Sequence, residues 1–263
     1  MLAFDLVVPT KLEEALGHLS GAEAQAIAGG QTLIPTMKAR LAAPERLVSL
    51  RGIDELRGLS LEGDALVVRA MTTHAEVARG ARDAFPALAD LAGNIGDPMV
   101  RNRGTIGGSL ANNDPSACYP SAVLACGATI LTTRREILAD DFFQGLFATA
   151  LEENEVIRAV RFPIPRAACY VKFAQAASRF ALTGVFVARF DTGVRVAVTG
   201  ASSEGVFRWA EAEVALGEAF GPAAVEALEP PAGDMISDPH GSGAYRAHLA
   251  RVLTARAATA MAG

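Results

Sequence analysis

The sequence predicts an α+β fold, in which short helices mix with strands that are joined by hairpins. Apolar residues repeat at helical spacing over residues 12–19, whereas residues 59–68 form two apolar runs around the turn Glu62-Gly63-Asp64. The sequence has no internal repeat, and its mixture of elements argues against a doubly wound parallel sheet. With 263 residues, 51% of them hydrophobic, the chain is long enough for one large domain or two modest ones.

The beginning of the chain predicts a small β-α-β unit. Thr10-Lys11-Leu12-Glu13 fits a capping box that opens a helix, and Ser20-Gly21 ends that helix. Pro35 suits the first turn of the next helix. The remaining elements expected in this unit are a strand over residues 25–28, a helix over 36–41 and a strand over 46–50.

The following residues predict a second unit with antiparallel strands. A hairpin of residues 59–61 and 65–68 comes first, and Thr73-His74-Ala75-Glu76 is a capping box for the helix after it. The other elements expected are helices over 86–91 and from Pro120 to Gly127, and strands over 128–132 and 156–162.

Phe162-Pro163-Ile164-Pro165 marks the expected domain boundary, because two prolines two residues apart interrupt regular structure. No flexible Gly/Ser linker follows, so the second domain should pack tightly on the first. It should contain a hairpin of residues 183–190 and 194–201 and a closing helix over 244–261 that buries Tyr245, Leu249, Val252 and Leu253. The predicted division is 1–165, with subdomains of about 1–56 and 57–165, and then 166–263.

Composition and cysteine usage exclude several classes of function. The net charge is −5, with acidic and basic residues interspersed, which does not suit nucleic-acid binding. No stretch approaches the roughly 20 apolar residues of a spanning helix, and no signal peptide is evident, so we expect a cytoplasmic protein without membrane insertion. Cys118, Cys126 and Cys169 lie far apart, which excludes an iron–sulfur or zinc site built from this chain alone. Any electrons that pass through this chain would need an organic cofactor.

Two glycine-rich segments, Ala28-Gly29-Gly30-Gln31-Thr32 and Thr105-Ile106-Gly107-Gly108-Ser109, are the candidate binding elements. Glycine lets the backbone turn through positive φ and lets a phosphate approach the amide N–H groups. The hydroxyls of Thr32 and Ser109 are suited to donate to phosphate oxygens, and two converging loops would suit a pyrophosphate. Neither standard nucleotide fingerprint is present, so spacing alone indicates a phosphate site, with simple turns as the alternative.

Longer stretches around these segments resemble a known family. Ala28-Gly29-Gly30-Gln31-Thr32-Leu33-Ile34-Pro35 resembles the first FAD motif of the flavin-binding medium subunit of molybdenum hydroxylases, in the carbon monoxide dehydrogenase and xanthine dehydrogenase superfamily. The stretch from Gly96 to Pro115 resembles its second FAD motif. Lys172 to Phe180 resembles the start of its C-terminal domain, so the similarity covers essentially the whole chain.

The resemblance implies a two-subdomain FAD-binding fold (PCMH-like) followed by a small α+β flavoprotein C-terminal domain. It also implies a small subunit with two [2Fe–2S] clusters and a large molybdopterin subunit as partners, assembled as a dimer of heterotrimers. The chain would accept electrons from the clusters and pass them to an external acceptor. No catalytic side chain is expected, because the flavin carries the redox chemistry. Substrate specificity would reside in the large subunit, so carbon monoxide, an aldehyde, a purine and an N-heterocycle all stay open.

The family's cofactor contacts transfer to fifteen positions. Ile95 would lie against the flavin, with ordinary core packing as the alternative. Lys172 would stabilise negative charge on the reduced ring, with a solvated strand lysine as the alternative. Ile157 would offer a backbone contact, and Cys118 takes a position where the family has a contacting aspartate. The glycine segments supply Ala28, Gly29, Gly30, Gln31, Thr32, Leu33, Thr105, Ile106, Gly107, Gly108 and Ser109, beside the pyrophosphate and ribityl chain.

Cys118 is the main departure from the family pattern. A thiol is a poor acceptor, so about 1–3 kcal/mol of hydrogen bonding to a cofactor hydroxyl would be missing. Packing as a small hydrophobe is the simplest interpretation, and a covalent cysteinyl-flavin link is an alternative. Two other functions stay open: a stand-alone FAD oxidoreductase and a non-redox scaffold with weakened flavin binding.

Three further side chains near these motifs receive structural interpretations. Asp114 is expected to cap the helix that follows Pro115. Arg101 and Arg103 are expected to be solvated, with the steering of acidic partners or a place in an interface as the alternatives.

Overall fold

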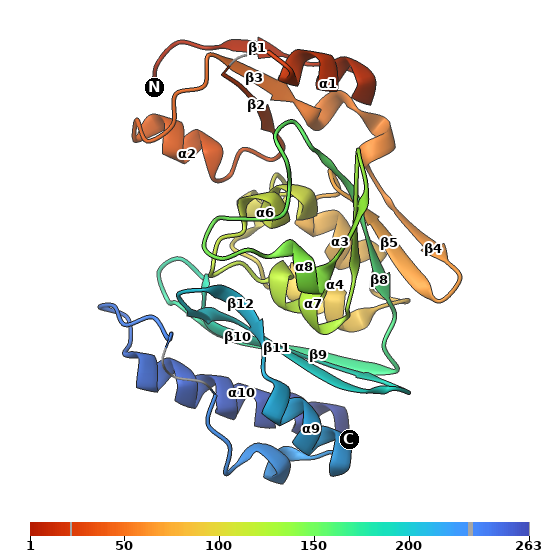
Figure 1. Cartoon of the computed structure of the whole chain (residues 1–263), viewed down its shortest axis with the longest axis vertical. Coiled ribbons are helices and arrows are strands. Elements are labelled where there is room, and N and C mark those ends of the chain that lie inside the picture. The colour runs from red at the N-terminus through yellow and green to blue at the C-terminus, as the bar shows by residue number, and fades with distance from the viewer. Residues whose placement is uncertain (22, 231–233, 263) are drawn as a thin grey trace.

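The computed structural model describes residues 1–21, 23–230 and 234–262. Three β-sheets follow one another along the long axis of the molecule, and helices fill the spaces between them and cover the last one (Figure 1). The strand orders are β1-β3-β2, β4-β5-β8-β6-β7 and β12-β11-β10-β9. This mixture of parallel and antiparallel sheets with short helices confirms the predicted α+β class.

The N-terminal unit is a three-stranded parallel sheet with one helix packed on it. Its core joins Leu12, Ala15 and Leu19 of the first helix to Val48 of the sheet. The β-α-β prediction is confirmed, and the edge strand β1 is an addition that the sequence pattern did not indicate. The elements are β1 (Asp5–Val7), α1 (Leu12–Leu19), β2 (Ala24–Ile27), α2 (Leu33–Lys38) and β3 (Arg46–Ser49).

Two local predictions in this unit are wrong in detail. The N-cap of α1 is Lys11, which makes no side-chain capping bond, so the capping box at Thr10 does not form. Instead the carboxylate of Glu14 accepts a hydrogen bond from the Thr10 amide at 3.3 Å. Helix α2 begins at Leu33, three residues before the expected start, because its first turn already contains Pro35.

The central unit is a five-stranded antiparallel sheet against which most of the short helices pack. The predicted capping box at Thr73 is confirmed: its hydroxyl accepts from the Glu76 amide at 3.2 Å, and the Glu76 carboxylate accepts from the Thr73 amide at 2.8 Å. The predicted hairpin of β4 and β5 is also confirmed. The elements are β4 (Leu59–Glu62), β5 (Ala65–Arg69), α3 (His74–Gly80), α4 (Pro86–Gly93), α5 (Pro98–Arg101), α6 (Ile106–Asn112), α7 (Tyr119–Ala125), β6 (Thr129–Thr132), β7 (Glu136–Leu138), α8 (Ala139–Phe142) and β8 (Ile157–Pro163).

The C-terminal unit is a four-stranded antiparallel sheet that is buried on both faces. Along β10, Phe186 and Ala188 face the core of the central unit, whereas Val185 and Val187 face α9 and α10 (Figure 1). This two-sided burial joins the units tightly, as the absence of a flexible linker predicts. The elements are β9 (Ala167–Ala174), β10 (Ala181–Phe190), β11 (Gly193–Ser202), β12 (Gly205–Arg208), α9 (Ala210–Glu218) and α10 (Gly243–Ala262).

The predicted buried stripe of the closing helix is partly wrong. Leu249 and Leu253 are buried, but Tyr245 is 40% exposed and Val252 is only half-buried. The helix is rotated because it buries Arg246, whose guanidinium donates to the carbonyls of Leu182 and Gly200 at 2.7 Å each. Hydrophobic periodicity does not predict a buried arginine. Within the described part of the chain, no helix is long and apolar enough to cross a membrane.

Candidate functional site

A cavity of about 510 Å³ opens where the two glycine segments meet. Its volume lies within the ~300–1,000 Å³ range of small-molecule sites. Of the fifteen candidate residues, all but Ile106 line this cavity; the side chain of Ile106 is fully buried in the core behind the wall. The fold therefore brings together residues that lie up to 144 positions apart in the chain, from Ala28 to Lys172.

The two glycine segments touch each other directly. A Cβ at Gly29 would overlap the carbonyl oxygen of Arg103 and would lie 2.8 Å from the Cα of Gly104. A Cβ at Gly108 would lie 3.2 Å from the Cβ of Ala28. The backbone of each segment thus approaches the other at positions where a side chain would keep them apart.

The conformation of the second segment differs from the expected loop. Thr105 is the N-cap of α6, and its hydroxyl accepts from the Gly108 amide at 3.2 Å, so Gly107 and Gly108 are helical. Among the four described glycines of the two segments, Gly30 alone has a positive φ, of 70°. Gly107 is required for close packing instead, because its Cβ would lie 2.6 Å from the Cβ of Ala70. The positive-φ explanation is therefore wrong for three of these glycines, and close approach is the reason that holds.

The hydroxyls of Thr32 and Ser109 are available to a ligand. Both residues line the cavity, and neither hydroxyl makes a hydrogen bond to another residue in the described part of the chain. Leu33 and Ile95 add apolar surface to the wall. The combination of free hydroxyls, bare backbone and apolar walls is suited to a ligand with phosphates and flat rings.

Lys172 links two turns at one end of the cavity. It lies on β9, and its ammonium donates to the carbonyls of Asn94 at 2.6 Å and Arg179 at 2.8 Å. The Sγ atom of Cys118 lies 3.7 Å from the same nitrogen. The alternative of a solvated strand lysine does not fit these three contacts, since they hold the turn that carries Ile95 and the turn that follows β9.

Arg101 and Asp114 occupy places that the sequence did not indicate. Arg101 is not solvated: its Nη1 atom donates to the carbonyls of Ile95 at 3.0 Å and Gly96 at 2.8 Å, which braces the same turn. Asp114 lines the cavity but does not cap the following helix. Its carboxylate accepts from the Ser116 amide at 2.8 Å, and the residue at the N-cap of α7 is Cys118.

Several wall residues were missed by sequence reasoning, and His74 is the most informative of them. Its ring is buried beside Tyr119, with 5.3 Å between the ring centroids, and its Nδ1 atom has no hydrogen-bond partner among the described residues. Burial, and then the charge of Arg101, lowers the pKa of His74 to about 4. The imidazole is therefore neutral at physiological pH. The other missed wall residues include Leu151, Glu155, Val156, Ser178, Arg179 and Phe180.

Acidification should destabilise the protein through His74. The pKa of this ring in the folded chain, about 4, lies below the 6.5 of an exposed histidine, so between these values the unfolded chain binds a proton that the folded chain does not. Stability should fall by at most about 3 kcal/mol as the pH drops from 6.5 to 4, and be unaffected by this group below that window. Urea unfolding at several pH values measures this loss of stability. His74→Leu should lack the loss between pH 6.5 and 4, whereas His248→Gln, which changes an exposed histidine, should retain it. An equal loss in both variants would contradict the role given to His74.

Comparison with known proteins identifies the family. Residues 2–165 match the model of the FAD binding domain in molybdopterin dehydrogenase. The chain is 33% identical to the carbon monoxide dehydrogenase medium chain of Hydrogenophaga pseudoflava, over 98% of this chain and 96% of that one. It is 35% identical to the nicotine 6-hydroxylase medium subunit of Paenarthrobacter nicotinovorans, over 94% and 93%. This chain belongs to the FAD-binding subunits of the molybdopterin dehydrogenases.

Solved structures agree with this assignment. The structure of quinoline 2-oxidoreductase from Pseudomonas putida 86 superposes with a TM-score of 0.89 at 31% identity, covering 99% of this chain and 97% of that chain. Carbon monoxide dehydrogenase from Hydrogenophaga pseudoflava gives 0.86 at 34% identity, covering 97% and 96%. The fold and the FAD cofactor implied by the sequence resemblance are thus confirmed, and the chain is an FAD-dependent oxidoreductase subunit.

The cavity fits FAD on structural grounds. Gly29, Gly30, Gly107 and Gly108 all line the cavity, so the cofactor's pyrophosphate can approach backbone that carries no side chain. Thr32 and Ser109 offer hydroxyl donors, and Lys172 offers a cation at one end. The other end is apolar, with Leu50 and Met71 in its wall. A dinucleotide with two ring systems and a central pyrophosphate matches this distribution.

Proposed function

We propose that this chain is the electron-exit subunit of a molybdenum hydroxylase. It would receive electrons from [2Fe–2S] clusters of a small partner subunit and deliver them through FAD to an external acceptor. The observation that carries this proposal is the cavity itself, which combines both glycine segments with Lys172 from the C-terminal sheet. The domain division at residue 165 is part of the proposal, and the change of sheet between β8 and β9, which end and begin on either side of that residue, supports it.

Each group of cavity residues has one task in this proposal. The segments 28–33 and 105–109 would hold the pyrophosphate and ribityl chain, with Ile157 contributing its backbone. Ile95 would pack against the flavin ring, and the charge of Lys172 would stabilise negative charge on that ring. When bound, FAD accepts and releases electrons at its ring, so the protein need not supply a nucleophile or a general acid. The buried walls restrict access of water to the cofactor.

The partners follow from the same proposal. Relatives are named medium chains or subunits, which implies at least two other kinds of subunit in those enzymes. We infer a small iron–sulfur subunit and a large molybdopterin subunit, assembled as a dimer of heterotrimers in the cytoplasm. The substrate would bind to the large subunit, so carbon monoxide, an aldehyde, a purine and an N-heterocycle stay candidates.

Co-purification from the native host tests this function. Iron, molybdenum and FAD should elute together with this chain, and addition of the substrate of the complex should bleach the flavin absorbance. Stoichiometric FAD without iron or molybdenum would favour a stand-alone FAD oxidoreductase. A colourless protein that does not bind added FAD would favour a non-redox scaffold and would contradict the proposal.

Cys118 should limit the affinity for FAD. Its Sγ atom lies at the cavity wall, 3.7 Å from the Lys172 ammonium, where a carboxylate would gain both a cofactor contact and an ion pair. We expect Cys118→Asp to bind FAD about tenfold more tightly, which corresponds to ~1.4 kcal/mol, and Cys118→Ser to change little. Fluorescence titration measures both variants. Equal affinity in wild type and Cys118→Asp would show that the thiol does not weaken FAD binding. Flavin retained by the acid-denatured protein would reveal a covalent link.

A further inference from the structure

One wall of the cavity is formed by the connection between α8 and β8. Helix α8 ends at Phe142 and β8 begins at Ile157, and the connecting residues contain no helix or strand. Leu151, Glu155 and Val156 of this connection line the cavity together with Ile157. Surface connections are ordinarily mobile, so a wall of this kind needs something to hold it.

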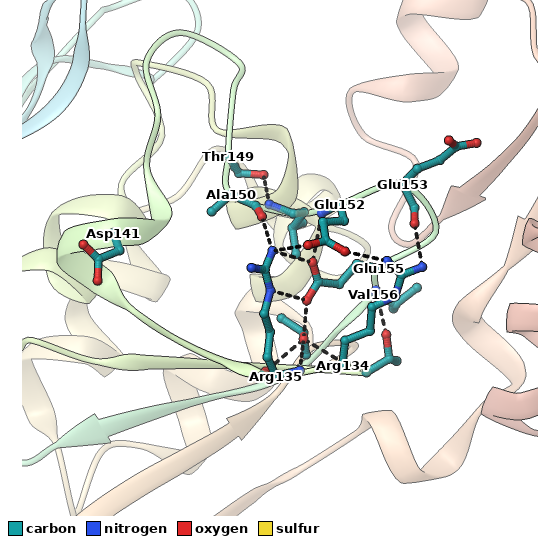
Figure 2. Close-up of polar contacts among 12 residues, drawn as sticks. Arg134, Arg135, Asp141, Thr149, Ala150, Glu152, Glu153, Glu155 and Val156 are labelled. Atoms are coloured by element: carbon teal, nitrogen blue, oxygen red, sulfur yellow. Dashed lines mark hydrogen bonds and ion pairs between the residues drawn. The ribbon is translucent and has the colours of Figure 1, made fainter.

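A polar network behind the wall provides that support (Figure 2). The Glu155 carboxylate accepts hydrogen bonds from the Thr132 hydroxyl at 2.6 Å, the Glu152 amide at 2.9 Å and two nitrogens of Arg135 at 3.1 and 3.2 Å. Arg135 also donates to the Ala150 carbonyl at 2.7 Å. These bonds join the turn between β6 and β7 to residues 150–155, and fix the loop at both ends of its cavity-facing part.

A second arginine extends the network toward solvent. Arg134 pairs with the Glu152 carboxylate at 2.7 Å and donates to the Glu153 carbonyl at 2.9 Å (Figure 2). The Val156 amide donates to the Thr133 hydroxyl at 3.2 Å. Consecutive residues of the turn thus hold consecutive residues of the loop, which sets the position of the wall along its whole length.

The network is better suited to positioning than to stability. The Glu155 side chain has no exposed surface, and transfer of a carboxylate out of water is costly. Although burial raises the pKa of Glu155, the hydrogen bonds from Arg135, the Glu152 amide and Thr132 outweigh it and lower the pKa to about 2. The group is therefore ionised and satisfied. Well-packed apolar residues would stabilise such a site about as well as an ion pair does. The presence of the Glu155–Arg135 pair therefore points to a need to hold the loop in one position.

The wall lies at the end of the cavity remote from Lys172. Val156 packs in the same core cluster as Leu50 and Met71, next to the N-terminal sheet, and Figure 1 shows this green loop beside that sheet. Lys172 belongs to the C-terminal sheet, on the opposite side of the central unit. In the proposed function Lys172 marks the flavin end, so the loop wall is left for the adenosine half of FAD.

We infer that Glu155 and Arg135 are positioning residues for the wall that receives the adenosine half of FAD, and that they make the cavity selective for FAD over FMN. This inference rests on the proposed function. Neither side chain needs to touch the cofactor. Leu151 and Val156 would form the apolar surface for adenine, and the network would hold that surface at a fixed distance from the glycine segments.

Paired titrations with FAD and FMN test the inference on the full-length chain. Glu155→Gln removes the charge that orients Arg135 and keeps the size of the side chain. We expect its dissociation constant for FAD to rise at least tenfold, while that for FMN stays within twofold of wild type. The ratio of the FMN dissociation constant to the FAD dissociation constant, measured by flavin fluorescence, should therefore fall at least fivefold. A merely structural role would weaken both ligands alike or change only the melting temperature.

The ion pair between Glu136 and Arg161 offers a matched control. It lies on β7 and β8 of the same sheet, with its oxygen and nitrogen 3.1 Å apart, but it is largely exposed and does not line the cavity. Glu136→Gln should leave the ratio unchanged. If Glu155→Gln does not fold, Arg135→Met, which removes the other partner, should give the same fall in the ratio.

The outcomes separate this inference from the proposed function. An unchanged ratio in a variant that still folds, or an equal loss of FAD and FMN binding, would overturn the positioning role alone. Failure of the wild-type chain to bind FAD would overturn the proposed function as well. A selective loss of FAD in Glu155→Gln and Arg135→Met, with Glu136→Gln unaffected, would establish the wall as the specificity element.

Discussion

Gly29→Ala should lower the affinity for FAD at least a hundredfold. The added Cβ would overlap the Arg103 carbonyl oxygen and lie 2.8 Å from the Gly104 Cα. These are backbone atoms of the turn that leads into the second glycine segment, so no side-chain rotation relieves the clash. The two segments must separate, and the hydroxyls of Thr32 and Ser109 then no longer converge on one ligand. The same overpacking should cost about 1–3 kcal/mol of folding stability.

Gly217→Ala is the matched control for this substitution. Gly217 lies in α9, a helix that does not line the cavity, and a Cβ there would meet nothing within 4 Å. Because alanine favours helix over glycine, this variant should be more stable by about 0.5–1 kcal/mol and should bind FAD as wild type does. Equilibrium titration with FAD and urea unfolding measure both properties. Wild-type affinity in Gly29→Ala would show that contact between the segments is not needed for binding.

Lys172→Met should weaken FAD binding and make the flavin harder to reduce. The substitution leaves the carbonyls of Asn94 and Arg179 without their charged donor, and hydrogen bonds of this kind contribute about 1.5–3 kcal/mol each. The turn that carries Ile95 should loosen, and the affinity should fall tenfold or more. Removal of the cation also disfavours negative charge on the reduced ring. The midpoint potential should become more negative, by roughly 30 mV for each 1.4 kcal/mol of lost stabilisation.

Two variants separate the charge of Lys172 from its contacts. Lys172→Arg keeps the charge but not the geometry of the ammonium, so the potential should stay near that of wild type while the affinity falls. Lys11→Met removes an exposed lysine that precedes α1 and should change neither property. A redox titration of the FAD-loaded chain gives the potential. An unchanged potential in Lys172→Met would contradict a role for this cation at the flavin.

Local sequence signals predicted the elements whose cause is local. The capping box at Thr73 and the hairpins around Gly63 and Gly193 depend on residues a few positions apart, and each is confirmed. Helix α6 was missed because its first turn holds Gly107 and Gly108, which are poor helix formers. Their place in the helix is set by close packing against Ala70, which is a tertiary contact.

The same distinction applies to the site. The resemblance to the family located Ile95, Cys118 and Lys172, although composition and spacing alone indicated only a phosphate site. His74 and Glu155 were missed for a physical reason. A lone histidine and a glutamate in the acidic run 152–155 have the pattern of ordinary surface residues, and only the fold buries the first and brings Arg135 across to the second.

The central claim is that the cavity between the two glycine segments holds FAD. A crystal structure of this chain with FAD tests it most directly. We expect density for the pyrophosphate between residues 28–32 and 105–109, with the flavin ring at the Ile95 and Lys172 end and the adenine against Leu151 and Val156. FAD bound elsewhere, or bound in the cavity in the reverse direction, would contradict the account.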